Sequence, residues 1–382
     1  MRTISMETQT FHNGRILTDK GELRELSFTG GVVADHGRRH NFGRTVDLEG
    51  DYLIPGLVEL HTDNLEKHFI PRTGVNWPIG LSSVVAHDVH MVGSGVTTVF
   101  DAVTVGEPGD KHMRKELFHL SLDALEEADK AGLLRADHYL HLRCEVAGDD
   151  VVELVEPLLE RKNLRLFSIM DHTPGQRQWR DLEEYKRYSN LQHEPEDRFQ
   201  ERIGGLRTMQ EKNARGNIRE IVEICRKNGF PLASHDDTTV EQVRETAALD
   251  TRISEFPTTL EAAREAGCLG MVIVMGAPNV VRGGSHSGNV AAVELACEGL
   301  LDILSSDYMP ASLLHAAFLL PELAGMTLAE ALRTVTLTPA AAVGLEDRGE
   351  LAPGKRADAV RVKLVNGVPM VRSVWREGMR VL

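Results

Sequence analysis

A histidine and a carboxylate stand two residues apart in the segment PGLVELHTDNLEKH, residues 55–68. The apolar run before them predicts a strand, and because side chains of a strand repeat every two residues, His61 and Asp63 are expected on one face. Both could then bind one divalent cation, since imidazole nitrogen and carboxylate oxygen are ligands of Zn²⁺ and related ions. Taken alone, such a pair is more often a hydrogen-bonded structural feature than a metal site.

Three more side chains of this kind follow short apolar runs. Glu145, His235 and Asp307 each stand at or near the end of such a run. With His61 and Asp63 they form a mixed set of histidines and carboxylates, which suits Zn²⁺, Mn²⁺, Ni²⁺ or Fe²⁺, bound as one ion or two. A bound ion would lower the pKa of its water toward about 7, and Asp307 is placed to take up the proton.

A second feature is the glycine-rich segment VRGGSHSGN, which directly precedes a helical pattern. Backbone N–H groups at such a turn suit an anion, although a plain tight loop is the competing interpretation. Arginines near other expected strand ends favour phosphate, because the guanidinium is planar and always charged. The side chains and backbone expected to hold phosphates are those of Arg72, Arg143, Arg177, Arg282, Gly283, Gly284, Ser285, His286 and Ser287.

The elements that must position these residues alternate between short apolar runs and helical patterns. This alternation predicts an α/β fold with a (β/α)₈ TIM-like barrel, in which active-site residues lie at the carboxyl ends of the strands. Polar residues gather at these strand ends, although loops are polar in any soluble protein. The expected strands are residues 53–60, 96–103, 138–146, 164–170, 230–235, 252–257, 270–276 and 301–307.

The two ends of the chain do not fit a barrel. Residues 1–52 and 346–382 carry short alternating pieces with glycine turns, so we expect one small β-sandwich domain built from both ends beside a barrel of residues 53–345. Between the fourth and fifth strands, 17 of the 40 residues from Gln176 to Arg215 are charged. This stretch predicts a solvated helical excursion, or a lid that carries Arg177 and Arg180 over the barrel mouth.

The composition is that of an ordinary globular protein. The 382 residues include 43 basic and 57 acidic side chains, for a net charge of −14, which argues against nucleic-acid and membrane-surface partners. The first residues lack an apolar secretory core, so we expect a cytoplasmic protein. The four cysteines have no paired spacing and are expected to be buried, reduced thiols.

At this point the residues show a family resemblance. LIPGLVELHTD and GELAPGKRADAV resemble the two ends of an amidohydrolase-superfamily chain, where a barrel opens after one half of a β-sandwich and closes before the other. Within that superfamily, the segments HTDNLEKHF, HLRCE, MDHTPGQRQ, LASHDD, EFPTTLEAAR, MGAPNVVRGGSHSGN and LSSDYMPASLL resemble phosphonate-degrading enzymes of the carbon–phosphorus lyase pathway.

This resemblance implies hydrolysis of α-D-ribose 1-methylphosphonate 5-triphosphate to the 5-phosphate and pyrophosphate. It implies one or two divalent ions per subunit, Zn²⁺, Mn²⁺ or Ni²⁺. It implies a small sugar triphosphate or phosphonate as the substrate, and a second copy of the chain as a possible partner. It also implies catalytic roles for His235 and Asp307. On its motifs, the metal ligands are His61, Asp63, His235 and Asp307.

The sequence departs from the wider superfamily in three places. His-x-Asp replaces His-x-His on the first strand, no lysine ends the fourth strand, and the sixth strand offers Glu255 where histidine is common. The bridging ligand is therefore open: Glu145 is the first choice, and Asp171, His172 and Glu255 are alternatives. Two other functions also remain open, an amidase or deaminase acting on a cyclic substrate and a non-catalytic relative that has lost its metal.

Overall fold

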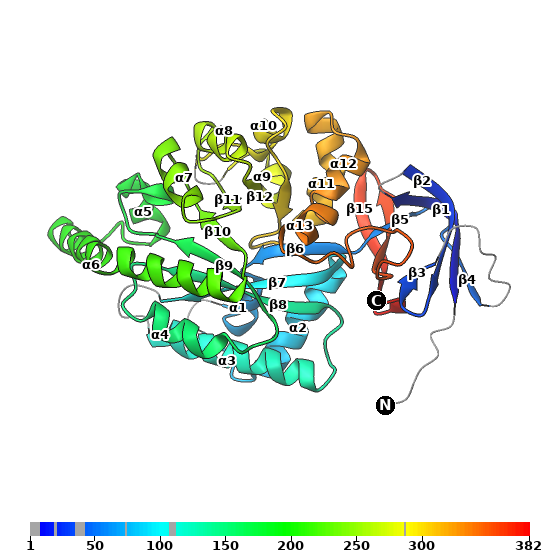
Figure 1. Ribbon diagram of the computed structural model, residues 1–382, viewed down its shortest axis with the longest axis horizontal. Helices are drawn as coiled ribbons and strands as arrows, with labels where there is room; N and C mark the ends of the chain where they lie inside the picture. Colours follow the sequence, from blue (N-terminus) through cyan, green and yellow to red (C-terminus); the bar gives the residue numbers. More distant parts are fainter. Residues whose placement is uncertain (1–7, 19–20, 35–42, 73–74, 107–111, 286–287) are drawn as a thin grey trace.

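A parallel barrel and a second, mixed sheet make up the chain in the computed structural model (Figure 1), which describes residues 8–18, 21–34, 43–72, 75–106, 112–285 and 288–382. The barrel occupies the middle of the molecule, and the mixed sheet lies at one end, near both chain termini.

Eight parallel strands form the barrel, each hydrogen-bonded to the next in chain order. A bridge between Thr62 and Asp307 joins the last strand to the first, and Thr62 Oγ1 donates to the Asp307 carbonyl at 3.0 Å. All eight expected strands are therefore confirmed. Their bounds are β6 (Leu57–Thr62), β7 (Val96–Val105), β8 (Asp137–Glu145), β9 (Leu164–Met170), β10 (Leu232–His235), β11 (Ile253–Glu255), β12 (Val272–Gly276) and β13 (Ile303–Ser305).

The first expected strand is divided between the two sheets. Its beginning lies in β5 (Tyr52–Pro55), which pairs antiparallel with β14 (Ala359–Val365) of the mixed sheet, and the barrel starts only at Leu57. Gly56 forms the passage between them. A Cβ at this position would lie 2.2 Å from Thr97 Oγ1, so the close approach of the two segments requires glycine.

The mixed sheet contains strands from both ends of the chain, as expected. Strand pairing unites them in one eight-stranded sheet, and a bridge from Val32 to Arg356 shows that its edge curls back toward the segment before β14. Phe11, Phe28 and Trp375 pack at its centre, with ring centroids 4.6 and 5.0 Å from Phe11. The remaining strands are β1 (Gln9–Thr18), β2 (Gly21–Thr29), β3 (Val32–Val33), β4 (Arg44–Asp47), β15 (Val368–Arg376) and β16 (Met379–Arg380).

Helices surround the barrel, whose interior is filled by apolar side chains from its own strands, among them Val58, Leu60, Phe100 and Leu166. No helix in the described part of the chain is long and apolar enough to cross a bilayer. The helices are α1 (Asn64–Phe69), α2 (Gly80–Gly93), α3 (His112–Lys130), α4 (Val151–Val155), α5 (Leu182–Tyr188), α6 (Glu196–Asn228), α7 (Val240–Ala247), α8 (Leu260–Cys268), α9 (Ala277–Arg282), α10 (Ala292–Cys297), α11 (Ser312–Ala324), α12 (Leu328–Arg333) and α13 (Leu337–Ala342).

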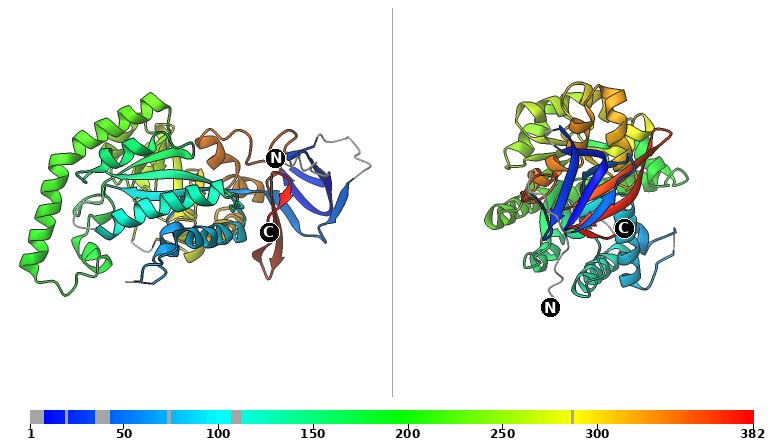
Figure 2. Two further views of the ribbon diagram at one scale, coloured as in Figure 1. Left: turned by 90° about the horizontal axis from the view of Figure 1, so that it is seen from below. Right: turned by 90° about the vertical axis from the view of Figure 1, so that its right-hand side faces the viewer.

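The charged stretch after β9 is helical, as expected. Helix α6 has 33 residues and runs along the end of the molecule away from the mixed sheet (Figure 2). Gln210 Nε2 donates to Asp171 Oδ2 at 2.9 Å, and Asn217 Nδ2 donates to the carbonyls of Val146 and Gly148 at 2.9 and 2.7 Å. The middle of α6 is thus fixed to the loops that follow β8 and β9, beside the barrel mouth.

The expectation for the cysteines is half right. Cys144 and Cys225 are buried free thiols, whereas Cys268 and Cys297 are exposed.

Candidate active site

Two histidines and a glutamate from three strands meet inside the mouth of the barrel. The rings of His61 on β6 and His235 on β10 are stacked, with centroids 5.4 Å apart. Glu255 on β11 connects them, because its Oε1 lies 3.1 Å from His61 Nδ1 and its Oε2 lies 3.2 Å from His235 Nδ1. All three are buried, and each offers a ligand atom within 4.8 Å of the others.

Burial keeps both of these imidazoles neutral. It lowers the pKa of His61 to about 3, helped by the charge of Arg143, and it lowers the pKa of His235 well below its usual value. Burial also raises the pKa of Glu255 to about 7. Neutral histidines beside a carboxylate have nitrogen lone pairs available, which is the state that binds a metal ion.

A second group adjoins the first through His235. Asp236 Oδ2 lies 3.4 Å from His235 Nε2 and 3.6 Å from His172 Nε2. This oxygen is buried and accepts no hydrogen bond from any residue that the structure describes. A buried carboxylate oxygen without a donor, facing two imidazoles, fits the ligand set of a divalent cation.

Glu145 lies on the far side of this second group. Its Oε1 forms a short contact with His172 Nδ1, and its Oε2 accepts from the His172 backbone N–H at 3.4 Å. Burial alone would lower the pKa of His172, but the charges of Glu145 and Asp236 outweigh burial and raise it to about 10. Glu145 is therefore engaged with His172 and not with the stacked pair of His61 and His235.

Asp63 reaches the site in a different way from that expected. The pairing register of β6 with β7 shifts between Glu59 and Thr62, and Asp63 lies beyond the strand as the residue before α1. Asp63 therefore lies outside the regular part of the strand, and His61 Nε2 and Asp63 Oδ1 lie 4.0 Å apart. Asp63 also forms an ion pair with Arg143, so one expected metal ligand is bound to an expected phosphate ligand.

Asp307 adjoins this ion pair and lies two residues after the end of β13. Its backbone has a φ of 52°, and its carbonyl accepts from the Asp63 N–H at 3.0 Å. Burial, followed by the charge of Asp63, raises the pKa of its carboxyl to about 7. A carboxyl with a pKa near neutrality suits a general base at neutral pH.

The expected phosphate ligands are spread over the mouth. Arg177 is turned inward, where its Nη1 donates to the His235 carbonyl at 2.8 Å and to Asp237 Oδ1 at 2.6 Å. Arg72 and Arg282 are exposed. Gly283 and Gly284 have φ values of 76° and 150°, Ser285 follows them half-buried, and His286 and Ser287 lie outside the described residues.

The alternative ligand Asp171 turns away from the site. Its Oδ2 accepts from Gln210 and its Oδ1 accepts from the Thr173 N–H at 3.1 Å. Among the alternatives to Glu145, Glu255 and His172 thus lie with His235, whereas Asp171 holds α6.

Sequence reasoning missed Glu59 and His141. Glu59 is fully buried and accepts from the backbone N–H groups of His61 and Ser306 at 2.7 and 2.6 Å, and from Ser305 Oγ at 2.7 Å. The ring of His141 lies 5.0 Å from that of His61. The alternation of His141, Arg143 and Glu145 along one strand could have indicated His141, but nothing in the local sequence indicated Glu59.

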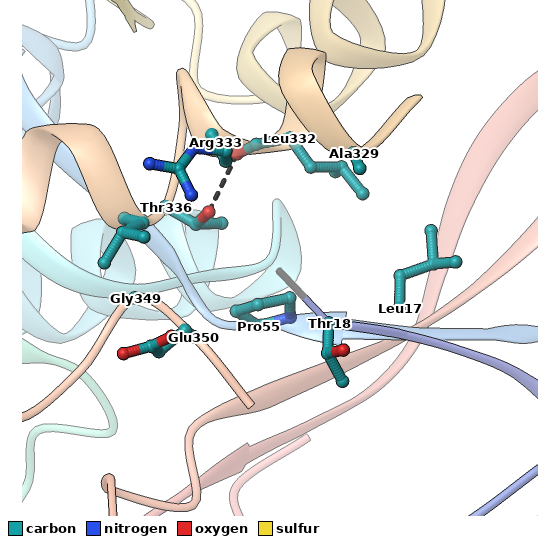
Figure 3. A pocket seen from close by; sticks show the side chains of 10 residues that line it. Leu17, Thr18, Pro55, Ala329, Leu332, Arg333, Thr336, Gly349 and Glu350 are labelled. Carbon is teal, nitrogen blue, oxygen red and sulfur yellow. Dashed lines mark hydrogen bonds between the residues drawn. The ribbon is translucent and has the colours of Figure 1, made fainter. Parts of the chain in front are cut away.

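The small pocket drawn in Figure 3 is separate from the candidate site at the barrel mouth. It lies between the mixed sheet and the turns of α12 and α13, beside Pro55, which precedes the barrel. It contains none of the expected site residues. Its lining residues are Leu17, Thr18, Pro55, Ala329, Leu332, Arg333, Thr336, Leu337, Gly349 and Glu350.

Comparisons with solved structures agree with the fold described above. Among solved structures, molinate hydrolase superposes with a TM-score of 0.66 at 14% identity, covering 99% of this chain and 95% of its own. Dihydropyrimidinase from Brevibacillus agri NCHU1002 does so with a TM-score of 0.64 at 12% identity, covering 98% and 95%. At these identities the likeness concerns the fold.

Sequence comparison goes further. The α-D-ribose 1-methylphosphonate 5-triphosphate diphosphatase of Escherichia coli (strain K12) is 47% identical over 372 residues, which are 97% of this chain and 96% of that protein. The pattern of the Amidohydrolase family matches residues 170–378. The chain therefore belongs to the amidohydrolase family.

Proposed function

We propose that this chain hydrolyses α-D-ribose 1-methylphosphonate 5-triphosphate to the 5-phosphate and pyrophosphate, as a step of phosphonate catabolism. The observation that carries the proposal is the 47% identity, over nearly the whole of both chains, to an Escherichia coli enzyme named for this reaction. One water is consumed, one P–O bond of the bridge between the α- and β-phosphates breaks, one P–O bond forms, and a proton is released.

The donor set at the mouth fits a divalent ion. His61, His235 and Glu255 would hold it, together with the unpartnered Oδ2 of Asp236 and, for a second ion, Asp63. We place Glu255 in this set in preference to Glu145, because Glu255 contacts both neutral histidines whereas Glu145 contacts His172. A divalent ion bound there, Zn²⁺, Mn²⁺ or Ni²⁺, would draw charge from the phosphate and lower the pKa of the attacking water.

The residues of the chain supply the remaining parts. Asp307, with its pKa raised to about 7 by burial and by Asp63, accepts the proton of the water. Arg143, held between Asp63 and Met170 Sδ, presents positive charge at the same point. Arg177 acts on the site by fixing the carbonyl of His235 and does not itself contact phosphate.

The test is ³¹P NMR of the protein incubated with the sugar triphosphate, before and after chelation and after addition of Mn²⁺, Zn²⁺ or Ni²⁺, with ATP as the comparison substrate. The expected products are pyrophosphate and a 5-monophosphate only, with activity lost on chelation and restored by one of the metals. Stepwise release of orthophosphate, or intact triphosphate under every metal, would overturn the proposal. In the second case, turnover of cyclic amides or amines would support the alternative hydrolase.

A further inference from the structure

Tyr308 connects two cations that come from different elements at one side of the barrel mouth. Lys67 on α1 donates its ammonium hydrogen to the Tyr308 carbonyl, and Nζ lies 5.1 Å from the centre of the Tyr308 ring. Arg282, the last residue of α9, points Nη1 at Tyr308 Oη from 3.4 Å. Tyr308 directly follows Asp307, so the two cations are gathered beside the expected general base.

Neither of these two side chains forms an ion pair with a residue that the structure describes. Arg143 and Arg177 each form an ion pair, with Asp63 and with Asp237. Lys67 and Arg282 both contact Tyr308, and in the described ranges neither has a carboxylate oxygen within 4.0 Å. In a chain of net charge −14, two cations that meet at one tyrosine without an ion pair to a described residue form a place for an anion.

The surroundings leave room for that anion. Arg282 is exposed, and a Cβ added at Gly283 would meet no atom of the described residues within 4 Å, so these residues leave space beside the backbone at this turn. Burial lowers the pKa of Lys67, while the charges of Asp307 and then Asp63 raise it. The ammonium of Lys67 is thus close enough to both carboxylates to be influenced by them.

We propose that Lys67, Tyr308 and Arg282 form the subsite for the two terminal phosphates of the substrate, the part that leaves as pyrophosphate. This inference rests on the proposed function and adds the orientation of the substrate in the barrel mouth. The pyrophosphate end lies over β6, β12 and β13, and the ribose end points toward the side of the mouth where α6 is fixed. As the bridging P–O bond breaks, negative charge accumulates on the pyrophosphate, and the two cations stabilise it.

The experiment compares Lys67→Met with wild type and with Lys227→Met, which removes the same charge from the exposed end of α6. Calorimetry of the metal-loaded proteins measures the dissociation constants of inorganic pyrophosphate and of the other product, the sugar 5-phosphate. Lys67→Met should weaken pyrophosphate binding by about 10- to 100-fold, because a charge-assisted contact is lost, and should change binding of the sugar phosphate by less than about threefold. Lys227→Met should leave both unchanged, and Lys67→Arg should recover most of the affinity.

Kinetics separate this inference from the proposed function. If wild type cleaves the triphosphate and Lys67→Met also raises KM and lowers kcat, both proposals stand. If wild type cleaves it but Lys67→Met binds pyrophosphate as tightly as wild type, or loses both products equally, the subsite is wrong and the function stands. If wild type does not cleave the triphosphate yet binds pyrophosphate in a Lys67-dependent way, the function is wrong and the anion subsite stands.

Discussion

At the scale of single residues, the balance between burial and the neighbouring carboxylates decides the charge of each histidine. His61 and His235 share one glutamate in a dry environment, and burial dominates, so both are neutral. His172 lies between the two carboxylates Glu145 and Asp236, whose charges overcome burial and keep it protonated. Neighbouring imidazoles of one site are thus suited to different tasks, the first two to binding a cation and the third to carrying a proton.

This difference gives a test of the ligand set. Glu255→Gln removes the carboxylate between the two neutral histidines and should lower metal affinity by at least about tenfold, with loss of activity. Glu145→Gln is the matched variant, and it should keep the metal because its partner is His172. Elemental analysis of the purified proteins after dialysis measures the bound metal. If the Glu255→Gln variant kept its full metal content and the Glu145→Gln variant bound no metal, Glu145 would be the bridging ligand instead.

At the scale of elements, a buried polar network fixes helix α1, which follows Asp63 and carries Lys67. His87 on α2 and His138 on β8 bind the two oxygens of Asp101 on β7, at 2.7 and 2.8 Å. Asn64 in the first turn of α1 donates to His87 Nδ1 at 2.8 Å. The network therefore links α1, α2, β7 and β8 behind the site, and all of its hydrogen-bonded groups are withdrawn from water.

This network predicts a pH dependence of stability. Burial would lower the pKa of His138, but Asp101 and then Asp88 outweigh it and raise the pKa to about 9. The unfolded value is about 6.5, so the stabilisation is complete below about pH 6.5 and is lost as the pH rises through about 9. The difference in free energy of unfolding between wild type and His138→Gln should be about 3 kcal/mol larger at pH 6 than at pH 10.

Urea denaturation followed by circular dichroism measures these free energies. His119→Gln on the exposed surface of α3 is the control, and its effect should be the same at both pH values. An effect of His138→Gln that does not change with pH would mean that folding leaves the pKa of His138 unchanged.

Replacing glycine by alanine should have opposite effects on stability at Gly148 and Gly205. A Cβ at Gly148, after β8, would lie 1.6 Å from the Gly106 carbonyl oxygen after β7, so Gly148→Ala must push the two loops apart and should cost about 3 kcal/mol or more. Gly205 lies inside α6 with no atom within 4 Å of a Cβ, and Gly205→Ala should stabilise by about 0.5–1 kcal/mol. Thermal unfolding measures both, and a Gly148→Ala variant as stable as wild type would contradict the close contact.

The elements were predictable where the sequence pattern is local. Apolar runs identified all eight barrel strands, and the residues at their ends identified His61, His235 and Asp307. The register shift in β6 and the passage at Gly56 depend on neighbouring strands, so a regular period of two could not indicate them. The sequence also left Glu255 as one of three alternatives to Glu145. Its place between two histidines depends on how three separate strands are arranged around the barrel.

At the scale of the whole molecule, one carboxylate joins the barrel to the C-terminal part of the chain. Asp137, the first residue of β8, binds Arg348 Nη1 at 2.6 Å, Arg356 Nη1 at 2.7 Å and Arg376 Nη2 at 2.6 Å. Arg376 belongs to β15 of the mixed sheet, and the side chain of Arg348 is only 5% exposed. The end of the barrel opposite the site is therefore closed by an ion-pair cluster that forms only when the C-terminal part of the chain is in place.

Removing the charge of Asp137 should consequently destabilise the whole molecule. Asp137→Asn keeps the size of the side chain but leaves three largely buried arginines without their shared carboxylate, and the expected loss in free energy of unfolding is about 3–5 kcal/mol. Asp123→Asn is the control, because Asp123 pairs with Arg161 at 3.3 Å while its side chain is 75% exposed, and it should cost less than about 1 kcal/mol. Urea denaturation of both variants measures the difference. Equal, small losses would mean that apolar packing between the sheet and the barrel holds the two parts together without this cluster. The expected inequality would make Asp137 the residue through which the C-terminal part of the chain stabilises the barrel.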